Sequence, residues 1–146
     1  PALCKLGVVH LKLGDAGAAA DSFRRAVELD AENPYAHRML GYSLMTMGDV
    51  AGAEPEAKAA VELAPDDAKS QLLLAAISYR LGNTKEAETH YKAAIAADPL
   101  PSEPYFNLAV ICSRTKRLDE ARDYYHQALE RGALPDPALQ EILAKQ

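Results

Sequence analysis

Residues 74–91 read LAAISYRLGNTKEAETHY, and a related stretch lies 34 residues before them and 34 residues after them. The earlier copy, at 40–57, reads LGYSLMTMGDVAGAEPEA, and the later copy, at 108–125, reads LAVICSRTKRLDEARDYY. A further copy, at 6–23, reads LGVVHLKLGDAGAAADSF. The four copies align without insertion or deletion, so the chain is built on a repeat of 34 residues.

The positions that recur are those that shape and pack helices. Each copy opens with a large apolar residue and a small one, Leu6-Gly7, Leu40-Gly41, Leu74-Ala75 and Leu108-Ala109, and Ile142 continues the first column. Two alanine columns follow: Ala19, Ala53, Ala87, Ala121 and Ala26, Ala60, Ala94, Ala128. Between them three copies carry an aromatic residue, Phe23, Tyr91 and Tyr125. A turn column holds Gly14, Gly48 and Gly82, and a late column reads Ala31, Pro65, Pro99 and Ala133.

These columns predict an all-α chain in which each repeat is a helix, a tight turn and a second helix. Alanine is the strongest helix former, glycine can take the left-handed conformation that ends a helix, and proline cannot continue one. We expect eight helices in four hairpins, a closing C-terminal helix after Pro135, and no strand. The repeats span residues 1–33, 34–67, 68–101 and 102–135, and the closing helix occupies 136–146.

The paired residues at the start of each copy, the spacing Ala-x3-aromatic and the closing prolines resemble the signature of the tetratricopeptide-repeat family. The resemblance covers essentially the whole chain. It implies a right-handed superhelical solenoid of antiparallel helix hairpins, in which the first helices line a concave wall that holds peptide ligands. It is specific for the fold and weak for function, because the signature residues mostly serve packing.

Two repeats depart from this pattern. The second has Ala57 in place of the aromatic residue and Pro55 early in its second helix, where a proline removes a backbone donor. We therefore expect that helix to start late or to kink around Glu54 to Glu56. The fourth repeat has Lys116 in place of the turn glycine.

Composition excludes several classes of function. The net charge is −5, which disfavours nucleic-acid binding because that needs a dense basic surface. No apolar run approaches the ~18 residues of a membrane span. Cys4 and Cys112 lie three repeats apart, roughly 25–30 Å when neighbouring helices pack ~8–10 Å apart, which excludes a disulfide between them. The sequence indicates no cellular compartment.

Patterns typical of catalysis and of metal binding are missing from the sequence. The four histidines, His10, His37, His90 and His126, fall at four different places in the repeat and lack the spacing of a metal-ligand set. There is no Gly-rich phosphate loop, nucleophile elbow or H-E-x-x-H motif. We expect no enzyme activity, no metal and no cofactor.

Carried through the repeat, the resemblance places a binding surface on the inner faces of the first helices. This concave wall holds six Lys or Arg and one acidic residue, Glu103, while the rest of the chain has 10 basic and 20 acidic residues. Such a wall suits a segment with acidic and apolar side chains. The lysine and asparagine clamp of chaperone-binding family members is matched at Asn107 alone, so we expect no binding of chaperone C-termini. The candidate groove residues are Lys12, Tyr35, Arg38, Tyr42, Lys69, Tyr79, Arg80, Phe106, Asn107 and Arg114.

We thus expect a module that binds another protein or a peptide. Two alternatives are a structural or self-assembling scaffold, and the targeting arm of an enzyme whose catalytic domain lies outside this chain. The chain begins at Pro1, inside an expected helix, so we expect it to be a fragment. Leu3 and Leu6 would then lack an upstream helix to cover them, and we expect a second copy to form a homodimer through this end.

Overall fold

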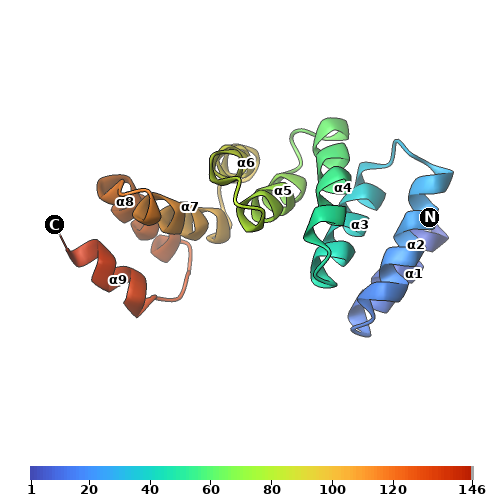
Figure 1. The fold of residues 1–146 in the computed structure, drawn as a ribbon, viewed down its shortest axis with the longest axis horizontal. Helices are drawn as coiled ribbons and strands as arrows, with labels where there is room; N and C mark the ends of the chain where they lie inside the picture. The colour runs from blue at the N-terminus through green and yellow to red at the C-terminus, as the bar shows by residue number, and fades with distance from the viewer. Residues whose placement is uncertain (146) are drawn as a thin grey trace.

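The computed structural model describes residues 1–145, and within them it contains nine α-helices and no strand. Eight helices form four hairpins, and the ninth closes the array (Figure 1). The all-α prediction is confirmed for this part of the chain. The helices are α1 (Ala2–Lys12), α2 (Ala16–Leu29), α3 (Pro34–Thr46), α4 (Val50–Leu63), α5 (Ala68–Arg80), α6 (Thr84–Ala97), α7 (Glu103–Arg114), α8 (Leu118–Glu130) and α9 (Pro137–Ala144).

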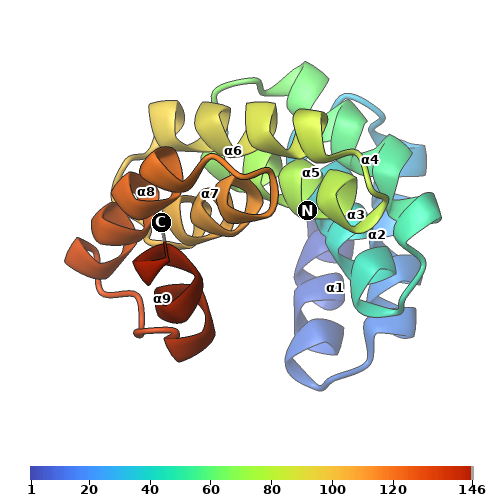
Figure 2. The same cartoon turned by 60° about the vertical axis from the view of Figure 1, so that its left-hand side comes forward.

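The hairpins stack in a row, and each packs mainly against its neighbours. The second helix of one hairpin contacts the first helix of the next, in the pairs α2 with α3, α4 with α5 and α6 with α7. Helix α3 also contacts α5, which brings first helices side by side. Figure 2 shows the row bent into an arch with α1 and α9 at its ends. This is the arrangement of a solenoid, in which packing is passed from repeat to repeat.

Small residues at recurrent positions let the helices come close. The first alanine column is fully buried at Ala19, Ala53, Ala87 and Ala121. In the first repeat a Cβ added to Gly7 would lie 2.6 Å from the ring of Phe23, so this aromatic side chain fills the space that the glycine leaves. In the second repeat a Cβ at Gly41 would lie 3.4 Å from the carbonyl oxygen of Ala53 on the neighbouring helix. The small residue after each leucine is therefore a packing requirement.

Turns inside the first three hairpins use glycine in the left-handed region, with φ of 80° at Gly14, 88° at Gly48 and 84° at Gly82. The fourth hairpin makes the same turn with a lysine, because Lys116 has a φ of 61°. A residue with a Cβ pays roughly 1–2 kcal/mol for that conformation. The fourth turn thus keeps the geometry of the others at a cost.

The expectation that the second helix of repeat two starts late is wrong. Helix α4 begins at Val50, after an Asp49 cap that accepts from the Gly52 amide, and it continues through Pro55 to Leu63. Pro55 removes the hydrogen bond that would reach the carbonyl of Ala51. Both residues are exposed, so water can hydrate that carbonyl in place of the missing donor.

A polar clip recurs at each junction between repeats. In the first turn of the next repeat's first helix, one side chain bonds the carbonyl oxygen six residues before it. His37 Nε2 lies 2.8 Å from Ala31 O, Gln71 Nε2 donates to Pro65 O at 2.9 Å, and Tyr105 Oη donates to Pro99 O at 2.9 Å. These three donors serve one column of carbonyls with three different side chains. Each clip satisfies a carbonyl in the break between two helices.

Both ends of the array expose apolar side chains. Leu6 is 43% exposed, whereas its counterparts Leu40, Leu74 and Leu108 are buried. In α9 the buried residues are Leu139 and Leu143, while Ile142 is 45% exposed. Ile142 thus continues the leucine column in the sequence but not in the core, because within residues 1–145 no further helix packs against that face of α9.

Candidate functional site

The wall of first helices contains a hollow of about 220 Å³ between α3, α5 and the start of α7. Its floor is apolar and its rim is charged. We call it the α3–α5 hollow, and it is lined by Arg38, Tyr42, Met45, Lys69, Leu72, Leu73, Ala76 and Glu103. Three of the ten candidate residues, Arg38, Tyr42 and Lys69, therefore meet at one place.

Arg38 is held in position by its own repeat and the next. Its guanidinium lies 5.2 Å from the centre of the Tyr35 ring, a cation–π contact. Its Nε lies 3.4 Å from Asp67 Oδ2, in the loop before α5, and makes no hydrogen bond within the described residues. Part of the charge of Arg38 is thus balanced within the chain, which the sequence did not indicate.

Tyr42 and Lys69 present the accessible groups of the hollow. Tyr42 is 46% exposed on α3, and Lys69 is exposed in the first turn of α5. Within residues 1–145 no carboxylate pairs with Lys69. Leu73 beneath them is buried and belongs to the core, while Leu72 is half-buried. The hollow therefore offers an aromatic side, an aliphatic floor and an unpaired ammonium group.

A second group of candidate residues meets between α5 and α7. Arg114 Nη1 donates to Tyr79 Oη at 2.5 Å, and the guanidinium lies 5.7 Å from the centre of the Tyr79 ring. Tyr79 and Asn107 also line a cavity of about 20 Å³ together with Tyr91. Burial raises the pKa of Tyr91 to about 12, so its phenol stays protonated at neutral pH.

The remaining candidates are scattered. Lys12 and Arg80 are exposed and line none of the hollows found among the described residues. Tyr35 lines a separate hollow beside α1, and Phe106 packs against the apolar cluster under α9. Several aromatic and methionine residues of the wall also serve packing, because they are partly buried against the apolar clusters: Met39, Met45, Tyr79 and Phe106.

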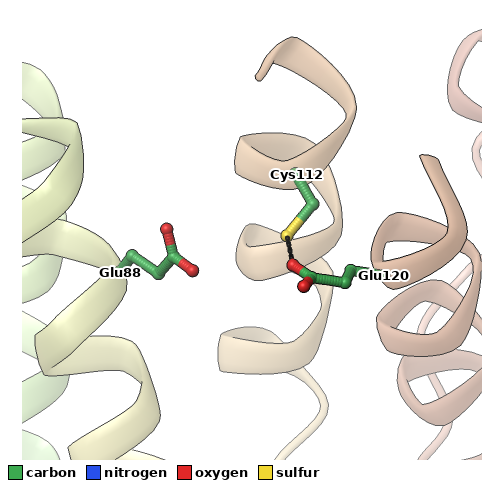
Figure 3. A group of neighbouring side chains, drawn as sticks. All are labelled: Glu88, Cys112 and Glu120. Carbon is green, nitrogen blue, oxygen red and sulfur yellow. Dashed lines mark hydrogen bonds between the residues drawn. The ribbon is translucent and has the colours of Figure 1, made fainter. Parts of the chain in front are cut away.

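Sequence reasoning missed a cluster that joins α6, α7 and α8. Ligand atoms of Glu88, Cys112 and Glu120 all lie within 4.8 Å of one another (Figure 3). Arg117 occupies both carboxylates, with Nη2 2.7 Å from Glu88 Oε2 and Nη1 3.1 Å from Glu120 Oε2. Its hydrogen bond lowers the pKa of Glu88 to about 2, and burial raises the pKa of the Cys112 thiol. The guanidinium supplies the positive charge at this site, so we interpret the cluster as a structural ion-pair network.

The cluster escaped sequence reasoning because its members are far apart in the chain, with Glu88 and Arg117 29 residues apart. The sequence offered only a weak sign of the cluster: Arg117 directly follows Lys116, which replaces the turn glycine of the other repeats. Cys4 and Cys112 are both buried, and each is a free thiol. None of the described helices combines the length and apolarity that crossing a bilayer would need.

The family model for the tetratricopeptide repeat matches residues 4–68, 38–100 and 72–136. This chain belongs to the tetratricopeptide-repeat family. A search of curated proteins found no match. Among solved structures, this tetratricopeptide-repeat chain is similar to a crystal structure of MamA, with a TM-score of 0.84 and 24% identity over 88% of this chain and 75% of the other.

Two further tetratricopeptide-repeat structures are similar. The crystal structure of YrrB, described as a TPR protein with an unusual peptide-binding site, has a TM-score of 0.78 and 24% identity, covering 91% of this chain and 68% of that one. The first TPR of Spaghetti (RPAP3), bound to the HSP90 peptide SRMEEVD, has a TM-score of 0.76 and 22% identity, covering 79% and 91%. At these identities the likeness shows the fold alone.

Proposed function

We propose that this tetratricopeptide-repeat chain binds an extended peptide or protein segment with acidic and apolar side chains on its wall of first helices. The observation that carries the proposal is the α3–α5 hollow, where Tyr42, Leu72 and Lys69 offer apolar contact beside an unpaired cation. Aromatic rings supply contact area at low entropic cost, and cations select acidic partners and speed their encounter.

Two further observations support a binding role. Members of the family commonly mediate protein–protein interactions, and two of the similar structures are described as binding a peptide or as having a peptide-binding site. In the cluster that sequence reasoning missed, the two carboxylates beside Cys112 pair with Arg117 and so serve structure. We therefore propose that the chain holds a partner and performs no chemistry on it.

The test compares wall variants with matched changes on second helices. A fluorescent peptide that alternates Leu and Glu residues serves as the probe, and its affinity is measured by anisotropy at low and moderate salt. We expect Lys69→Glu to weaken binding and to reduce its salt dependence, while Lys85→Glu on α6 has little effect. We expect Tyr42→Ala to weaken binding with little change in salt response, while Leu29→Ala on α2 does not. Binding lost in the α2 and α6 variants but retained in the wall variants would refute the proposal.

The SRMEEVD peptide offers a comparison in the same assay. The chain lacks the lysine and asparagine clamp of chaperone-binding relatives apart from Asn107. We therefore expect this peptide to bind no more tightly than a scrambled peptide of the same composition. Tighter binding of the unscrambled sequence would show that other residues make an equivalent clamp.

A second candidate is self-assembly through the first helix. Leu6 and Val9 on α1 and Leu13 at its C-terminal cap are exposed, and their spacing places them along one edge of the helix. Exposed apolar patches commonly mark contact surfaces. We propose that this α1 edge pairs with a second copy, independently of peptide binding on the wall.

A further inference from the structure

Arg114 keeps its charge unbalanced although it is held in place. One of its five N–H donors bonds the neutral phenol of Tyr79, which joins α7 to α5. Within residues 1–145 no carboxylate pairs with Arg114, whereas Arg24, Arg38, Arg117 and Arg122 each have an acidic partner. The remaining donors of Arg114 are therefore available to an acidic ligand.

Tyr79 fixes where those donors lie. It packs against the core cluster that contains Leu108 and Ile111, so its ring is anchored while its hydroxyl reaches the wall surface. A guanidinium already ordered by such a contact loses less entropy when a carboxylate binds it. Arginine also binds a carboxylate through two parallel hydrogen bonds, which makes the contact geometrically selective.

The hollow and the Arg114–Tyr79 pair lie on the same face of the wall. Leu72 in the hollow and Tyr79 are seven residues apart, which places them on one side of α5 about 10 Å apart along its axis. An extended chain covers this distance in about three residues. The hollow and the Arg114–Tyr79 pair differ in charge. Glu103 lines the hollow and Asp67 partly balances Arg38 there, whereas no carboxylate within residues 1–145 pairs with Arg114.

We infer that the wall recognises a two-point motif: an apolar side chain in the α3–α5 hollow and an acidic side chain about three residues further along an extended ligand, at the Arg114–Tyr79 pair. The inference rests on the proposed function and specifies its ligand. We assign an internal acidic side chain because the exposed pair on an open wall lets the segment continue past it.

Synthetic peptides with amidated C-termini test the motif. Each carries one Leu and one Glu in a Gly/Ser background, with the separation varied on either side of three, and each has a partner in which Glu is replaced by Gln. At the optimal spacing we expect Glu to bind about tenfold more tightly than Gln, since a guanidinium forms stronger hydrogen bonds with a charged carboxylate than with a neutral amide. A parallel set places a free C-terminal carboxylate at the Glu position, and tighter binding of that set would overturn the assignment to a side chain.

Two variants and a control locate the acidic contact, and a fourth variant tests the apolar contact. Arg114→Glu should abolish the preference for Glu over Gln, and Tyr79→Phe should reduce it by loosening the guanidinium. The control Arg25→Glu, an exposed arginine of α2 with no acidic partner within residues 1–145, should leave it unchanged. Tyr42→Ala should weaken both peptides equally.

The outcomes separate the two proposals. If the Gln peptides bind and Tyr42→Ala weakens them, but Arg114→Glu leaves the Glu preference intact or spacing has no effect, the two-point motif is wrong while the binding wall stands. If the wild-type chain binds none of the peptides, both proposals are wrong.

Discussion

The side chains of His37 and Glu56 meet at 2.7 Å across the hairpin formed by α3 and α4. Their counterparts one repeat later, Gln71 and His90, meet at 2.8 Å across α5 and α6. The same pair of positions thus carries a hydrogen bond in two successive hairpins, although the pair is His with Glu in one and Gln with His in the other. This link adds to the clip at the junction, because His37 and Gln71 also bond the carbonyls of Ala31 and Pro65.

Gln71→Leu should destabilise the fold by about 1–3 kcal/mol, because it removes two part-buried hydrogen bonds, to the carbonyl of Pro65 and to the Nδ1 of His90, and each such bond contributes about 0.5–1.5 kcal/mol. Urea unfolding followed by circular dichroism measures the change. Gln140→Leu, at an exposed position of α9, is the matched control and should change stability little. Equal effects of the two substitutions would contradict a role for the clip.

Gly7→Ala should destabilise the first hairpin by about 1–3 kcal/mol through overpacking, since the new Cβ would lie 2.6 Å from the Phe23 ring. The double variant Gly7→Ala with Phe23→Leu should recover part of the loss. Gly17→Ala on α2 is the control: its added Cβ would lie 3.6 Å from its nearest neighbour, so the higher helix propensity of alanine should be neutral or stabilising. Thermal unfolding of the three variants distinguishes packing from propensity.

Lys116→Gly should stabilise the chain by roughly 1 kcal/mol, because glycine adopts the φ of 61° without the steric cost that lysine pays. Lys116→Ala keeps the Cβ and removes the charge, so it should leave stability nearly unchanged. A rise in the melting temperature with alanine equal to that with glycine would assign the effect to charge and not to backbone conformation.

Acid should weaken the α6–α8 cluster through Glu88. Its pKa falls from 4.5 to about 2 on folding, because Arg117 hydrogen-bonds the carboxylate. A lowered pKa contributes stability that is complete above pH 4.5 and is lost as the pH falls toward 2. Burial also lowers the pKa of His90, which adds a loss of stability when that ring is protonated. We expect Glu88→Gln to be less stable than wild type at neutral pH.

Unfolding midpoints of both proteins across this range check the assignment. The difference between wild type and Glu88→Gln should shrink as the pH falls below 4.5. Loss of stability from His90 is common to both proteins and cancels in the difference. A difference that stays constant down to pH 2 would exclude Glu88 as the titrating group.

The α1 edge should drive association that depends on concentration. Leu6→Lys or Val9→Lys places a charge on this exposed apolar surface and should shift the chain toward monomer in sedimentation experiments. Leu134→Lys, at another exposed leucine, serves as the control. Association that survives both α1 substitutions would place the contact elsewhere.

The fold was predictable because its determinants are local and repeat. Columns such as Leu40, Leu74 and Leu108 report burial directly, and the structure places all three in the core. Pro55 misled because its cost depends on whether water reaches the carbonyl of Ala51, which the sequence pattern does not show. Ile142 belongs to the same column but is exposed, because a residue of that column is buried only where a following helix covers it.

The sequence could predict which side of the helices the candidate residues lie on, but not which of their side chains contact one another. The family resemblance, carried through the repeat, placed Tyr42 and Lys69 on the inner side of their helices, and both line the same hollow. The contact between Tyr79 and Arg114 joins residues 35 apart, and it depends on side-chain conformations that no spacing rule specifies. The sequence likewise did not show that Asp67 lies beside Arg38 and partly balances its charge.

Packing within each hairpin is closer than packing between hairpins, and this has a mechanical consequence. A load along the arch would strain the junctions first, while the hairpins kept their internal contacts. The hollow spans one such junction and the Arg114–Tyr79 pair spans the next, from α5 to α7. Stretching the chain would therefore open the hollow between α3 and α5 and draw Arg114 away from Tyr79, so tension would weaken the hold on a ligand at both contact points.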